Sequence, residues 1–348
     1  MRNCCKACFK DEQLQNIVNN TVRIGNCAFC GSKNVKVYPL GDPNGTQEIE
    51  DLLLPVLDLY VPAKPKSSGR SLSRALIEDW DIFNYSSPRQ VTQFLQTAYP
   101  YKTSSNPIKL VPVVLNVTKD DDILKGQSWE DFTDCIKHKN RFFVKDMIVD
   151  KFEDFLEPAS IEYGKKTPFY RARIGTDPKG YKTADMGAPP SSRALPGRIN
   201  PQGISELYLA KDEDTALREV RPSLYDYVTL GVLYPKDQIR VVDLSRFARI
   251  SPFKYTIDIS VIAANRVFIQ GMSTEVAHIM RRGDDDIEYI PTQYIAEFIK
   301  RCGYDGVQYN STVSENGVNV CIFNPEKFAC IGVLHKTVSD IQYQVQLI

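Results

Sequence analysis

Two pairs of cysteines near the amino terminus have the spacing of a metal site. Cys5 and Cys8 are separated by two residues, as are Cys27 and Cys30, and eighteen residues lie between the pairs. Two cysteines at this spacing can both point into one tetrahedron, and four thiolates leave no open coordination position. The pattern therefore predicts a structural zinc site, with Gly31 supplying the permissive backbone that a metal knuckle requires.

The residues around these pairs complete a small module. Leu14, Ile17 and Val18 recur at helical spacing and predict one short helix that covers the metal. Cys4 could replace Cys5 as a ligand. A module this small needs its metal simply to fold, although zinc ribbons also contact nucleic acid or other proteins. With 43 Lys plus Arg against 43 Asp plus Glu in the chain, we expect nucleic-acid binding only through this ribbon.

A second group of polar residues lies in the carboxy-terminal half. Residues 188–204 are rich in proline, glycine and serine, and they include Arg198 and Asn200. Such a loop exposes backbone N–H groups and a guanidinium, which can hold an anion such as a diphosphate. Because the chain has only three histidines, we expect carboxylates, arginines and hydroxyls to do any chemistry. The candidates outside the loop are Tyr170, Arg171, Tyr208, Glu219 and Ser311.

The order of these groups resembles the RES domain, a family named for its arginine, glutamate and serine and found in bacterial toxins that consume NAD. The resemblance runs from about Thr167 to Leu334 and follows five motifs in the family's order. These are Arg171, the loop Gly197-Arg198-Ile199-Asn200-Pro201-Gln202-Gly203, the strand Leu207-Tyr208-Leu209-Ala210, the helix Thr215-Ala216-Leu217-Arg218-Glu219-Val220, and Ser311.

The resemblance implies an α+β fold related to ADP-ribosyltransferases, with NAD as the substrate. It also implies cleavage of the nicotinamide–ribose bond by phosphate or water, as an NAD phosphorylase or NAD glycohydrolase. Departure of neutral nicotinamide leaves an oxocarbenium-like ribose, which a carboxylate can stabilise without a metal. The family pattern gives catalytic roles to Glu219, Arg171 and Ser311, and substrate-binding roles to Arg198, Tyr208, Tyr170 and Asn200.

Two positions leave the assignment open. Ile199 stands where many family members carry an aromatic residue, so a stacking partner for a base must come from elsewhere, and Tyr208 is one candidate. Arg173 lies two residues after Arg171, on the same face of a strand, and either could be the functional arginine. Relatives are commonly neutralised by a partner antitoxin, so the resemblance also implies such a partner. The cysteine module resembles a zinc ribbon that accompanies some RES and HEPN domains.

Two other functions remain compatible with the sequence. The protein could be an ADP-ribosyltransferase that modifies a macromolecule, with the zinc ribbon delivering the target. It could also be a zinc-ribbon protein that binds a nucleotide without cleaving it. Turnover of NAD alone, turnover only with a macromolecular acceptor, or no turnover would separate the three.

Short strands and a few helices are predicted to position these residues. Runs of β-branched and aromatic residues predict strands over 168–173, 206–210, 226–233, 240–244, 306–309 and 318–323. Helices are predicted over 214–221 and 292–300. In the first of them, Ala216, Leu217 and Val220 share one face with Glu219 at its edge, so we expect Glu219 to be partly buried beside the strand that carries Tyr208.

The 348 residues divide into three expected parts: a zinc-ribbon module over 1–61, a mainly helical region over 72–160 and an α+β RES domain over 167–340. A Pro/Ser/Lys-rich stretch after Val61 predicts a linker. Pro88 is expected in the first turn of a helix. Apolar runs are too short to span a bilayer, and the amino terminus lacks the apolar core of a secretory signal, so a cytoplasmic protein is expected.

Overall fold

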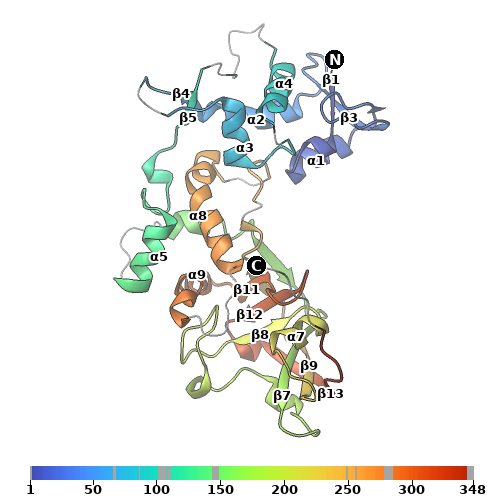
Figure 1. Ribbon diagram of the computed structural model, residues 1–348, viewed down its shortest axis with the longest axis vertical. Helices are drawn as coiled ribbons and strands as arrows, with labels where there is room; N and C mark the ends of the chain where they lie inside the picture. Colours follow the sequence, from blue (N-terminus) through green and yellow to red (C-terminus); the bar gives the residue numbers. More distant parts are fainter. Residues whose placement is uncertain are drawn as a thin grey trace. The chain divides into compact units, whose positions relative to one another are not determined.

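The computed structural model describes residues 2–65, 68–85, 87–100, 108, 111–142, 149–247, 250–254, 257–277 and 285–342. The chain packs as two compact units. One comprises Met1–Lys125 with Ser251–Arg266, and the other comprises Gly126–Ile250 with Val267–Ile348. Helices and strands of both units are labelled in Figure 1.

The first unit begins with the cysteine module. Strands β1 (Arg2–Cys5), β3 (Val35–Leu40) and β2 (Ile24–Gly25) form a three-stranded sheet in the order β1-β3-β2. Helix α1 (Glu12–Asn19) begins after Asp11, whose carboxylate accepts the first free N–H groups of the helix. Leu14 and Val18 on α1 are fully buried, which confirms the short helix that the sequence predicts.

The rest of the first unit is largely helical. It contains α2 (Glu48–Asp58), α3 (Leu72–Trp80) and α4 (Pro88–Ala98), with a two-stranded sheet of β4 (Tyr60–Pro62) and β5 (Val113–Leu115). Pro88 occupies the first turn of α4, as predicted. The rings of Phe9 and Phe29 lie 5.6 and 5.4 Å from the ring of Phe94 on α4. The cysteine module therefore shares its aromatic core with the helices that follow it.

An eight-stranded mixed sheet dominates the second unit, in the order β13-β9-β7-β8-β12-β11-β10-β6. A mixed α+β architecture is thus confirmed. Six of its strands were predicted from the sequence, whereas β6 and β13 were not; β13 carries a bulge between Cys330 and Gly332 that breaks the alternation of its side chains. The strands are β6 (Ser160–Tyr163), β7 (Phe169–Gly175), β8 (Leu207–Ala210), β9 (Tyr227–Pro235), β10 (Ile239–Asp243), β11 (Gly306–Asn310), β12 (Val318–Ile322) and β13 (Phe328–Thr337).

The remaining helices are α5 (Trp129–His138), α6 (Val149–Glu153), α7 (Glu213–Glu219), α8 (Ile259–Ala277) and α9 (Ile290–Arg301). α7 and α9 were predicted, whereas the 19-residue α8 was not. Apolar residues occur all round α8, so its sequence lacks the 3.6-residue period that reveals a surface helix. No described helix, α8 included, is long and apolar enough to cross a membrane.

The two faces of the sheet carry separate apolar clusters, and the second has alanines where α7 packs. Phe169, Leu209 and Val320 belong to the core cluster of the first face. The cluster on the second face contains Ala172 and Ala210, together with Ala216 of α7. Since alanine leaves little bulk between helix and sheet, α7 can lie close to β7 and β8. The end of α7 is thereby held beside the strand that carries Tyr208.

Candidate active site

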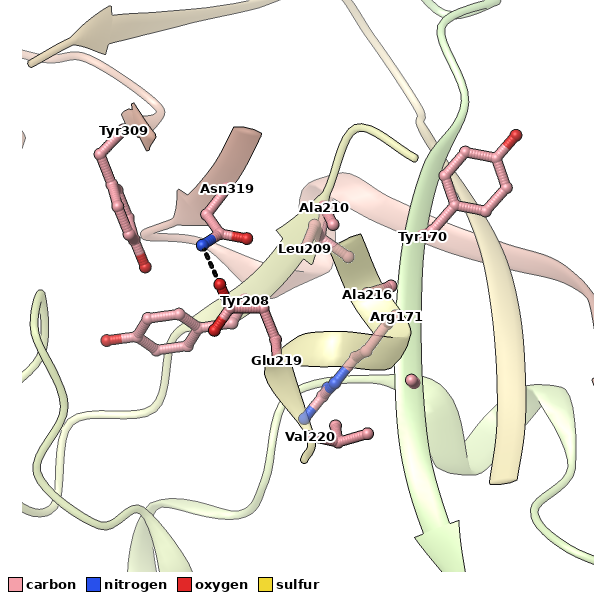
Figure 2. A pocket seen from close by; sticks show the side chains of 11 residues that line it. Tyr170, Arg171, Tyr208, Leu209, Ala210, Ala216, Glu219, Val220, Tyr309 and Asn319 are labelled. Carbon is pink, nitrogen blue, oxygen red and sulfur yellow. Dashed lines mark hydrogen bonds between the residues drawn. The ribbon is translucent and has the colours of Figure 1, made fainter. Parts of the chain in front are cut away.

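A pocket of about 290 Å³ lies where β7 and β8 separate. Within the described chain these strands pair at a single position, Tyr170 with Ala210, whereas β7 pairs with β9 along its length. Residues from both faces of β7 and β8 therefore reach the pocket, and α7 with the residue that follows it, β11 and β12 contribute the rest (Figure 2). The lining residues are Tyr170, Arg171, Ala172, Tyr208, Leu209, Ala210, Ala216, Glu219, Val220, Tyr309 and Asn319.

Four of the seven active-site residues expected from the sequence line this pocket: Tyr170, Arg171, Tyr208 and Glu219. Figure 2 shows the ring of Tyr170 directed away from Glu219, at the far side of β7. The other three, Arg198, Asn200 and Ser311, contact residues of the pocket wall instead. The family motifs thus separate into residues that face the cavity and residues that hold its wall.

Arg171 is the cation of the pocket. Its guanidinium donates to the carbonyl oxygens of Met186, at 3.2 Å, and Gly187. No salt bridge joins it to a carboxylate in the described part of the chain. Burial, and secondarily the charge of Arg173, lower the pKa of Arg171 to about 10. A half-buried guanidinium without a carboxylate partner in the described chain is suited to bind an anionic ligand.

Arg173 has a different environment from Arg171, although both belong to β7. Its guanidinium lies 4.1 Å from the ring centroid of Tyr181 and donates to the carbonyl oxygen of Asp185. Arg173 does not line the pocket. The geometry therefore favours Arg171 as the functional arginine of the two.

Glu219 is the last residue of α7. Its Oε1 atom accepts a hydrogen bond from Asn319 Nδ2 at 2.6 Å (Figure 2) and one from Ser311 Oγ at 2.7 Å. The expectation of partial burial is wrong, because Glu219 is exposed. The helix stops two residues earlier than the predicted 214–221 helix, since Arg221 adopts a left-handed φ of 48° before Pro222. The carboxylate consequently sits at the open end of α7.

The proline- and glycine-rich loop is hydrogen-bonded to the hydroxyl group of Tyr208. Tyr208 OH donates to Asn200 Oδ1 at 2.6 Å and accepts from Ile199 N at 3.1 Å. Asn200 is buried, and its Nδ2 donates to three loop carbonyl oxygens. A Cβ on Gly197 would lie 2.7 Å from Tyr208 OH, so this position requires glycine. Asn200 thus organises the loop, and the loop fixes the ring of Tyr208.

Arg198 belongs to the same loop and contacts α8. Its guanidinium donates to the carbonyl oxygen of Val276 at 2.7 Å, in the last turn of α8. It also lies 6.0 Å from the ring centroid of Tyr309, which lines the pocket. Arg198 itself is not among the lining residues. In this structure the guanidinium therefore supports the wall of the pocket from outside.

Two lining residues with polar side chains, Tyr309 and Asn319, were not among the expected site residues. Asn319 interrupts the apolar strand Val318–Ile322, and a buried polar residue in such a strand is the signal that could have revealed it. Burial raises the pKa of Tyr309 and Tyr208 well above the ordinary range, so both phenols stay neutral. Neutral aromatic walls suit a flat, uncharged or cationic ring.

The four cysteines of the amino-terminal module converge, with all Sγ atoms within 4.8 Å of one another. Cys5 and Cys30 are 3.3 Å apart and Cys8 and Cys27 3.4 Å, close to the sulfur separation of about 3.8 Å around a tetrahedral zinc. Cys5, and not Cys4, belongs to this cluster of four cysteines. Gly31, where a permissive backbone was expected, has a left-handed φ of 77°. The cluster is therefore a site that fits a metal ion.

Comparison with known proteins gives three results. The family model of the RES domain matches residues 168–345, just over half of the 348 residues. No curated protein matches the chain. Among solved structures, the chain is similar to a crystal structure of the M. tuberculosis MbcT-MbcA toxin-antitoxin complex, with 14% identity and a TM-score of 0.33, over 55% of this chain and 92% of that one.

Proposed function

This chain belongs to the RES domain family, and on that premise we propose that it is an enzyme that cleaves the bond between nicotinamide and ribose in NAD. The observation that carries the proposal is the pocket between β7 and β8, which brings Arg171, Tyr208 and Glu219 together. A cation for the anionic part of NAD and a carboxylate for the developing ribose cation are the two charges that this reaction needs.

In the proposed reaction, the bond from the pyridinium nitrogen to ribose C1′ breaks and nicotinamide leaves with the bonding electron pair as a neutral base. Positive charge then develops on the ribose, where the carboxylate of Glu219 stabilises it. An oxygen of phosphate or of water forms the new bond to C1′. With phosphate the second product is ADP-ribose carrying a phosphate on C1′, and with water it is ADP-ribose and a proton.

The size and walls of the pocket support binding of one end of the substrate. Its volume of about 290 Å³ is at the lower limit of small-molecule sites, which span about 300–1,000 Å³. We assign this space to the nicotinamide and its ribose, against the rings of Tyr208 and Tyr309. The remainder of NAD would extend past Arg171, whose guanidinium would hold the diphosphate or an attacking phosphate.

The metal that we propose for Cys5, Cys8, Cys27 and Cys30 is zinc. Four thiolates prefer zinc over harder cations, and a closed four-ligand site has no position for a substrate. The ion would therefore cross-link β1, the turn before α1 and the second knuckle, and thereby stabilise the first unit. It would take no part in NAD cleavage.

An enzyme that consumes NAD without restraint would deplete the cell that makes it. We therefore expect a partner antitoxin that blocks the enzyme, and we expect the protein to act in the cytoplasm, where NAD is available. Coexpression with the product of the neighbouring gene, followed by purification through one partner, tests this point.

Incubation of the purified protein with NAD, with and without phosphate, tests the proposed function. Release of nicotinamide in both conditions, or only with phosphate, supports hydrolysis or phosphorolysis respectively, and mass spectrometry of the second product identifies the acceptor. Turnover that requires a macromolecular acceptor would instead establish an ADP-ribosyltransferase. Binding of NAD without any release of nicotinamide would leave a nucleotide-binding protein.

A further inference from the structure

The carboxylate of Glu219 is held by one of its two oxygens. Both hydrogen bonds that it accepts, from Asn319 Nδ2 and from Ser311 Oγ, reach Oε1. In the described part of the chain no hydrogen bond reaches Oε2. Two donors on one oxygen fix the plane of the carboxylate and leave the second oxygen available to a ligand in the pocket.

The two donors are more rigid than the group that they hold. Asn319 is only 6% exposed and lies in the interior of the sheet, paired with Tyr309 on one side and Ala210 on the other. The hydroxyl oxygen of Ser311 accepts hydrogen bonds from the backbone N–H groups of two residues that follow it in the turn after β11. Glu219, in contrast, is exposed at the end of a seven-residue helix.

We propose that Asn319 is a positioning residue of the active site, which acts together with Ser311 on Oε1 of Glu219 so that Oε2 faces the substrate. This role rests on the proposed function and refines it. Asn319 need not touch the substrate, and Ser311 contributes through the same carboxylate oxygen. An exposed glutamate that lost both donors would sample several rotamers in water, and few of them would present the carboxylate to the ribose.

Three variants and a matched control test the proposal. Asn319→Leu keeps the approximate volume of the side chain but removes the N–H donor, and Ser311→Ala removes the hydroxyl donor. The double variant removes both. Gln308→Leu is the control, because Gln308 is also a buried polar residue of the sheet, 7% exposed, but is bonded to Asp243 and Tyr163 on the opposite face.

Each single variant should lower the kcat for NAD by about tenfold, the loss of one hydrogen bond to a charged group, with KM changed less than threefold. The double variant should fall by about a hundredfold, to the level of Glu219→Gln, while Gln308→Leu keeps the wild-type kcat. Wild-type kcat in Asn319→Leu, or an equal loss in Gln308→Leu, would overturn the positioning role. Wild-type protein that does not consume NAD would instead overturn the proposed function.

A crystal structure of Asn319→Leu provides a readout that does not depend on activity. The proposal expects the Glu219 carboxylate to leave its position or to occupy more than one rotamer, while β12 keeps its register with β11 and β8. An unchanged Glu219 carboxylate would contradict the proposal even if the protein proved to be an NAD-cleaving enzyme.

Discussion

Replacing Arg171 by methionine should make the free protein slightly more stable while abolishing its binding of NAD. Partial burial of the guanidinium, and secondarily the positive charge of Arg173, lower the pKa of Arg171 to about 10 from an ordinary value of about 12.5. At 1.36 kcal/mol for each tenfold change in proton affinity, the charged form is destabilised by about 3 kcal/mol in the folded state. Methionine fills a similar volume without a charge.

Arg171→Met removes this penalty, but part of the stability gained is offset by the hydrogen bonds that the variant loses. Arg171 donates to the carbonyl oxygens of Met186 and Gly187, and each such bond contributes about 1 kcal/mol net. Gly187 is exposed, so water can replace the donor there. The balance is a stabilisation of about 1 kcal/mol, which corresponds to a rise of about 2–4 °C in the Tm of the second unit.

The difference in stability between Arg171→Met and the wild type should depend on pH. Arg171 is charged in both the folded and the unfolded chain below pH 10, so the folded state carries the full penalty there. As the pH rises from about 10, the folded protein loses the proton first and the penalty decreases. The advantage of Arg171→Met should therefore be constant near neutral pH and shrink in alkaline buffer.

Thermal denaturation with and without NAD measures both effects. NAD at about a hundred times its Kd should stabilise the wild type by about 2.7 kcal/mol and leave Arg171→Met unchanged. Arg173→Met is the matched control, since it removes the neighbouring positive charge from the same strand. An Arg171→Met variant that is less stable than the wild type, or that still gains stability from NAD, would refute this reasoning.

Three further predictions concern the zinc site and the two other arginines. Metal analysis should find one zinc ion per chain, and Cys27→Ser with Cys30→Ser should abolish it; unchanged metal content would exclude this site. Chelation should unfold the first unit, seen as loss of its helical circular dichroism, and spare NAD turnover. Arg198→Ala should raise the KM for NAD about tenfold with a smaller change in kcat, because it supports the wall of the pocket; a normal KM with a collapsed kcat would place Arg198 at the reacting atoms. Arg173→Met should keep NAD turnover within about threefold of the wild type, and a larger loss would make Arg173 the functional arginine.

Local sequence patterns predicted the elements of the α+β domain well. The strands that carry Arg171 and Tyr208 and the helix that carries Glu219 are short segments with strong local signals, such as aromatic and aliphatic residues in the strands and a proline that limits the helix. RES family membership, inferred from five motifs, is confirmed. The zinc-ligand spacing also predicted which four cysteines converge, because two close pairs restrict the geometry strongly.

What the sequence did not predict depends on how distant segments pack. The pocket exists because β7 and β8 separate after one paired position, and no local pattern reports where two strands diverge. The burial of Glu219 was predicted wrongly, because its exposure depends on where α7 ends relative to the sheet. Asn319 lies one hundred residues after Glu219, so only the fold reveals that they meet. The boundaries expected for the three parts of the chain stay predictions.

The central claim is that Glu219 stabilises the ribose cation during NAD cleavage, and Glu219→Gln tests it most directly. The amide keeps the size of the side chain, removes its charge and replaces one of its two acceptor oxygens with an NH2 donor. We predict that the folded variant binds NAD with a Kd close to that of the wild type but releases nicotinamide about a hundredfold more slowly, equivalent to about 2.7 kcal/mol of lost transition-state stabilisation. Release of nicotinamide by folded Glu219→Gln at a rate near that of the wild type would show that another group does the chemistry.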